Sequence, residues 1–205
     1  MNTNLPSPTG TEAERTPLQQ AFLAFREQCI WLQTCFDIYK HLYESGEDTS
    51  RLMSAAAPLF FHDLNHILIE YCLRQVSRLT DPPRSMGRDN LTVEHVNSLL
   101  SAEGKLTPAI AAASEDLANY RALIRDARNR IISHADRQTA FDNIPLGEHT
   151  QADVAKFFQS LYSYVDEVGR AIDVGPLDFR STSGPGDVLD LLRYLKRGVS
   201  LTEEE

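Results

Sequence analysis

A seven-residue repeat of apolar side chains in residues 107–136 limits what this chain can fold into more than any other feature. The repeat consists of Ile110, Leu117, Ile124 and Ile131, and a second series three positions later consists of Ala113, Tyr120 and Ala127. Three- and four-residue steps return to the same side of an α-helix, so both series form one apolar stripe. Thr107 and Pro108 suit a helix start, since a threonine hydroxyl caps free amide groups and proline is tolerated in the first turn. We therefore expect one long helix over residues 107–136.

Apolar periodicity predicts five further helical segments, over residues 16–45, 49–80, 92–104, 150–172 and 188–196. Pro58 should bend or divide the second segment. The later part of that segment is apolar over most of its length, so we expect a central core helix that is covered on more than one side. No stretch alternates between apolar and polar residues as a half-buried strand would. The predicted fold class is all-α: an up-and-down helical bundle of four to five main helices with short accessory helices.

Composition divides the chain into three parts. Residues 1–15 are rich in Pro, Thr and Asn and lack periodicity, which predicts a disordered leader. Residues 16–173 are expected to form the bundle, and residues 174–205 a linker, a short helix and an acidic tail. Apolar residues make up 42% of the chain and charged residues 24%, and neither a secretory signal nor a membrane-spanning run is visible. We therefore expect a cytoplasmic protein that does not enter a membrane.

The three cysteines are predicted to be reduced, buried thiols. Cys29, Cys35 and Cys72 lie within apolar helical patterns and show no CxxC spacing. An odd number of cysteines in such positions argues against a disulfide framework and against a zinc site.

Positive charge is concentrated around the long helix although the net charge of the chain is −9. Residues 74–88 contain four arginines and one acid, and residues 121–137 contain five arginines and two acids, so each segment carries +3. A local basic surface of this kind can bind a phosphate backbone. The alternative is a solvated helix face whose arginines pair with neighbouring acids.

A short motif lies at the end of the predicted long helix. Arg128 and Asn129 are followed, after four residues, by His134, which takes the next core position of the second apolar series. Arg-Asn-x4-His at the end of a late helix resembles the signature of the HEPN superfamily, whose name stands for higher eukaryote and prokaryote nucleotide-binding domain. Residues 78–82 (RLTDP) and 90–100 (NLTVEHVNSLL) are further similar to its abortive-infection U type. The resemblance covers about residues 18–175.

This resemblance implies a metal-independent endoribonuclease that acts as a dimer on RNA and needs no cofactor, often as a toxin or antiphage effector. Histidine suits proton transfer near neutral pH, and arginine supplies a fixed cation for the charge that develops on phosphate. The residues that the resemblance implies for catalysis are Arg128, Asn129 and His134. The nearby Arg125, Arg130 and Arg137 are expected to bind the substrate.

The spacing of the motif itself favours a dimer. Residues 128 and 134 differ by about 120° in direction and by roughly 9 Å along a straight helix. One helix therefore does not place both side chains on one phosphate, whereas a two-fold dimer with the long helix at its interface can combine two copies of the motif.

Two other interpretations stay open at this point. His62 and His66 share a helix face with Glu70, which could form part of a metal site in a metal-dependent hydrolase. Nothing else in the sequence completes a ligand set, so we expect core or interface histidines there. The other alternative is a non-catalytic helical module for dimerisation, adaptor function or RNA binding, with a partner or antitoxin role. A cognate antitoxin protein is a further candidate partner.

Overall fold

The fold is built from four long helices joined by short elements. The computed structural model describes residues 15–85, 88–128, 150–180 and 184–202. The long helices are α1 (Pro17–Tyr43), α3 (Pro58–Thr80), α5 (Pro108–Arg128) and α7 (Gln151–Ala171). The shorter helices are α2 (Glu47–Ala56), α4 (Val93–Ala102) and α8 (Val188–Thr202). The predicted all-α bundle is confirmed, and the only strands in the described residues are β1 (Arg84–Ser85) and β2 (Arg88–Asp89), which pair antiparallel in the connection between α3 and α4.

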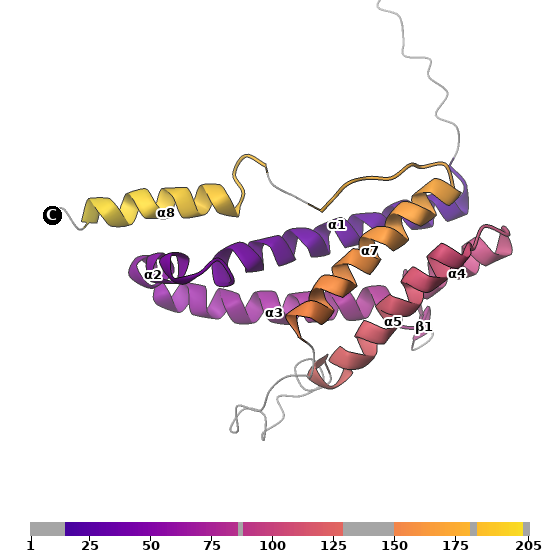
Figure 1. Cartoon of the computed structure of the whole chain (residues 1–205), viewed down its shortest axis with the longest axis horizontal. Helices are drawn as coiled ribbons and strands as arrows, with labels where there is room; N and C mark the ends of the chain where they lie inside the picture. The colour runs from indigo at the N-terminus through magenta and orange to yellow at the C-terminus, as the bar shows by residue number, and fades with distance from the viewer. Residues whose placement is uncertain (1–14, 86–87, 129–149, 181–183, 203–205) are drawn as a thin grey trace, which may run out of the picture.

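The long helices are arranged as two pairs. Figure 1 shows α1 and α3 lying side by side along the long axis of the molecule, with α7 crossing them and packing beside α5. The short helix α4 lies next to α5, and α8 lies at the opposite end, against α1 and α2. No helix in the described part of the chain is long and apolar enough to cross a membrane.

Local sequence signals fix where the helices begin. Thr16 and Thr150 each accept a hydrogen bond from the third residue of the following helix and form capping boxes with Gln19 and Asp153. Pro58 separates α2 from α3 and occupies the first turn of α3, where its missing amide proton costs nothing.

The apolar stripe of the predicted long helix is part of the main core. Ile110, Leu117 and Ile124 are fully buried, and Ala113 and Tyr120 are each 8% exposed. Side chains of α1, α3, α4 and α7 pack against this stripe. The side chain of Ala127 and all of Ile131 and His134 lie outside what the structure describes, so the burial of these three stays a prediction.

One expectation about α3 is wrong for the first half of the helix. The whole helix was expected to be covered on more than one side, yet Leu59, Phe60 and Ile67 are 72%, 59% and 60% exposed. Only one side of this half is buried, where Phe61 and Leu68 join a small second core beneath α2 and α8. An apolar run therefore identified a helix correctly but gave no information about how many neighbours that helix has.

The C-terminal region packs onto the bundle through α8 and the linker before it. Val188, Leu192 and Leu195 of α8 pack against the second core. The helix continues to Thr202, six residues beyond the expected end at residue 196. Within the linker, Phe179 is only 4% exposed and lies against Tyr162 of α7.

Candidate functional site

Arginines at positions 121, 125 and 128 form a row along the last two turns of α5. Steps of four and three residues place these positions on one side of the helix. Viewed down the helix axis, the three arginine positions lie about 40° to 100° from Ile124, which is the last buried residue of the apolar stripe in the described chain. The end of α5 therefore has a buried apolar side and an arginine-bearing side next to it.

The first arginine of the row contacts the end of α3. Arg121 Nη2 lies 3.1 Å and its Nε lies 3.2 Å from Oδ1 of Asp81, the residue that directly follows α3 as its C-cap. Both side chains are partly buried, with 35% and 21% of their surface exposed. Arg121 thus holds two helices together, and for this residue the ion-pair interpretation of the basic segment is correct.

Two residues of this row, Arg125 and Arg128, belong to the predicted site. Arg125 is exposed on α5, and Arg128 is the last described residue of the helix. Asn129, Arg130, His134 and Arg137 lie outside the described residues, as does the side chain of Arg128. The relative positions of Arg128 and His134 therefore stay a prediction.

The packing of α5 on α7 shows how the two helices on either side of residues 129–149 are arranged. Asp116 contacts Lys156 at 2.7 Å and accepts a hydrogen bond from Ser160 at 3.2 Å, whereas Tyr120 packs on Phe157. From Asp116 to Tyr120 the packing partner on α7 moves back from Ser160 to Phe157, and Figure 1 shows the two helices running in opposite directions, so they are antiparallel. The end of α5 at residue 128 and the start of α7 at residue 151 consequently lie at the same end of this pair.

The contact between Asp116 of α5 and Lys156 of α7 also shifts the pKa values of both groups. The hydrogen bond from Lys156 lowers the pKa of the Asp116 carboxyl, and the same contact raises the pKa of Lys156. Both groups are therefore charged throughout the neutral range, and their contact joins the two helices that flank residues 129–149.

The histidine pair of α3 lies elsewhere, on the half of the helix with an exposed apolar side. The rings of His62 and His66 are 4.8 Å apart in an edge-to-face arrangement, and both residues are exposed. Among the residues that the structure describes, no group of three or more histidines, cysteines or acids is placed to hold a metal ion.

The cysteines are free thiols, with Cys29 and Cys35 buried and Cys72 partly exposed. Burial raises the pKa of all three, that of Cys72 to about 12. They are therefore protonated near neutral pH, which does not suit a nucleophilic cysteine.

Comparison with protein families decides which group of helical proteins this bundle represents. The model of the AbiU2 family of HEPN domains matches residues 15–191, from the start of α1 to the first turn of α8. The chain belongs to this family. The match confirms the resemblance to the abortive-infection U type of HEPN domain, and it extends beyond residue 175 into α8. No curated protein and no solved structure matches the chain.

Proposed function

We propose that this AbiU2-type HEPN domain is a metal-independent endoribonuclease whose active site is formed by Arg128, Asn129 and His134. Membership of the family carries the proposal, together with the occurrence of the Arg-Asn-x4-His motif at the end of α5. The arginine row of α5 supplies positive charge next to that end, and we assign substrate binding to Arg125, Arg130 and Arg137. RNA is the proposed substrate because its 2′-hydroxyl is an internal nucleophile that DNA lacks.

The proposed reaction is attack of a ribose 2′-hydroxyl on the adjacent phosphate. The oxygen–phosphorus bond to the 5′-oxygen of the next nucleotide breaks, and a 2′,3′-cyclic phosphate forms. His134 moves a proton from the attacking hydroxyl or to the leaving oxygen, and Arg128 stabilises the negative charge on the phosphoryl oxygens. Asn129 orients the histidine or the phosphate through its amide group.

Cleavage of total cellular RNA by the pure protein tests this proposal. We expect cleavage to persist in excess EDTA, because no step requires a metal ion. The 5′ fragments should end in a 2′,3′-cyclic phosphate, and a 2′-deoxyribose at the cut position should block the reaction. Cleavage that stops with chelator and returns with a divalent ion would replace this mechanism with a metal-dependent one. RNA binding without cleavage would favour the non-catalytic alternative.

The site is proposed to be composite, with the end of α5 from two copies of the chain. The six-residue separation of Arg128 and His134 motivates this, because one straight helix directs the two side chains to different sides. Light scattering of dilute protein should give twice the monomer mass of 23.0 kDa. A monomer that cleaves RNA would show that one chain is sufficient.

We place this activity in the cytoplasm, as that of a toxin-type effector of abortive infection. A cognate antitoxin protein would then be the partner that restrains it. The family assignment supports this role, and co-purification of the untagged chromosomal neighbour with the tagged protein tests it.

A further inference from the structure

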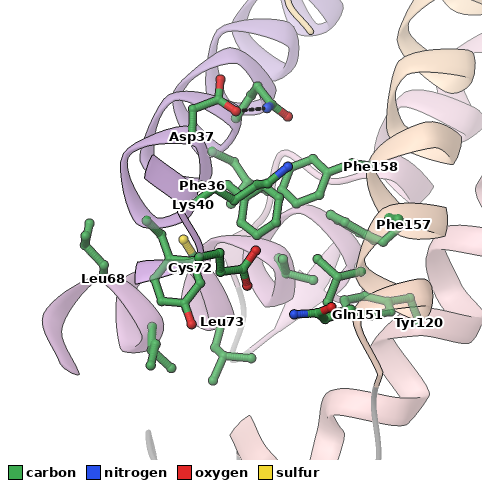
Figure 2. A pocket seen from close by; sticks show the side chains of 18 of the residues that line it. Phe36, Asp37, Lys40, Leu68, Cys72, Leu73, Tyr120, Gln151, Phe157 and Phe158 are labelled. Atoms are coloured by element: carbon green, nitrogen blue, oxygen red, sulfur yellow. Dashed lines mark hydrogen bonds between the residues drawn. The ribbon is translucent and has the colours of Figure 1, made fainter. Parts of the chain in front are cut away.

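A cavity of about 660 Å³ opens between α1, α3 and α7, and its lining includes none of the residues assigned to the proposed RNA site. Figure 2 shows Phe36 and Lys40 of α1, Cys72 and Leu73 of α3, and Phe158 of α7 around it. Its volume is typical of pockets that hold small organic molecules, which measure about 300 to 1,000 Å³.

One wall of the cavity is a row of aromatic rings. Phe36 stacks on Phe158 with 4.3 Å between ring centroids, and Tyr162 follows at 6.5 Å from Phe158. The Tyr162 hydroxyl donates a hydrogen bond to the side-chain oxygen of Gln33. Burial raises the pKa of Tyr162 to about 12, so this wall is uncharged near neutral pH. The surface favours a flat or aliphatic apolar body.

Two cations lie against this aromatic wall. Lys40 Nζ is 5.9 Å from the centroid of Phe36, and Arg180 Cζ is 5.4 Å from the centroid of Tyr162. Neither cation forms an ion pair with an acid in the described chain. Figure 2 shows the Lys40 side chain extending over Phe36 toward Phe158.

The acids that line the cavity are placed differently. Asp37 accepts a hydrogen bond of 2.7 Å from the side-chain amide of Gln33, so part of the hydrogen-bonding capacity of this carboxylate is already used. The carboxylate of Glu44 acts on Tyr39: burial raises the pKa of Tyr39, and the negative charge of Glu44 raises it further. The positive charge next to the stacked rings is therefore not neutralised by direct pairing.

We propose that this cavity binds a small organic anion with an apolar body. The body would lie against Phe36 and Phe158, and the carboxylate, sulfonate or phosphate group would pair with Lys40, with Arg180 as the second cation. Neither the proposal nor its test depends on RNA cleavage. The lining includes Tyr120 of α5 and Gln151 of α7, so a bound ligand would contact both helices that flank residues 129–149.

Fluorescence titration of the full chain with 8-anilinonaphthalene-1-sulfonate tests the site. The dye combines an aromatic body with an anionic group. Decanoate, decanol and decylamine then compete with it for the site; they share one aliphatic chain and differ only in the head group and its charge. We expect decanoate to displace the dye at a concentration at least about tenfold lower than decylamine, because an anion gains a charge-assisted contact with Lys40. Equal potency of the two, or stronger binding of the amine, would overturn the proposal.

Paired variants locate the binding. Ala155 is an exposed residue of α7 that lines the cavity, so Ala155→Trp should fill it and weaken dye binding at least about tenfold without disturbing the core. Ala112→Trp, at an exposed position of α5 outside the cavity, is the matched control. Lys40→Gln should remove the preference for decanoate over decylamine, whereas Lys196→Gln on α8 should keep it. Equal binding by both tryptophan variants would show that the dye binds elsewhere and would sink the proposal.

Discussion

Replacing His134 by alanine should lower the rate of RNA cleavage by about 10²- to 10⁴-fold, the usual contribution of a proton-transferring side chain. The expected loss follows from the proposed reaction, because the 2′-hydroxyl is a poor nucleophile until its proton is removed. RNA affinity should change much less, since arginines rather than His134 are assigned to hold the phosphates. Single-turnover cleavage of a labelled RNA measures the rate, and fluorescence anisotropy of an uncleavable 2′-deoxy analogue measures the affinity.

His62→Ala is the matched control for this experiment. His62 is an exposed histidine on α3 next to His66, and the proposed site does not include it. We expect this variant to cleave RNA at the rate of the unchanged protein. A folded His134→Ala dimer with the full rate would sink the assignment of the catalytic residue. Loss of activity in His62→Ala, together with loss of a bound ion, would instead revive the metal-site interpretation.

The helices themselves could be predicted because their signals are local in the sequence. Thr107 caps the start of α5 as expected, since its hydroxyl accepts a hydrogen bond from the Ile110 amide, and Pro58 divided the second helical region. Each of these residues acts within one turn of itself. The buried stripe of α5 could be predicted because apolar residues spaced seven apart lie on the same side of a helix.

Contacts between distant segments could not be predicted in the same way. The exposed side of α3 at Phe60 and Ile67 was missed, because hydrophobicity reports the preference of a side chain and not the number of helices that reach it. Arg121 and Asp81 are forty positions apart, and their pairing depends on how α3 and α5 pack.

The proposed RNA site could be predicted from the sequence, whereas the cavity could not. No sequence spacing relates Lys40 of α1 to Arg180 in the linker after α7, so the cavity could be recognised only from the packing of these segments. The RNA site was found in the opposite way, from a contiguous motif. Of its residues, the structure describes only Arg125 and the backbone of Arg128.

Leu117→Ala should destabilise the fold by about 2 to 5 kcal/mol, the usual range for removing a fully buried leucine side chain. Leu117 is in the middle of α5 and has no exposed surface. Helix α5 packs against α7, α3 and α4, so a void left by the missing atoms would adjoin side chains of several helices that cannot all move to fill it. Urea denaturation followed by far-ultraviolet circular dichroism measures the change, which corresponds to a drop in Tm of roughly 4 to 20 °C for a domain of this size.

Leu123→Ala on the same helix separates burial from helix propensity. Leu123 is 42% exposed, and leucine and alanine both favour helices, so we expect a change within about 0.5 kcal/mol. Equal destabilisation by the two variants would contradict the placement of the core on the Ile110–Leu117–Ile124 side of α5. The difference also bears on function, because α5 leads directly into residues 129–134. If Leu117→Ala and His134→Ala both reduced cleavage, only the former should regain the full rate when the temperature is lowered below its unfolding transition, since its catalytic groups are intact.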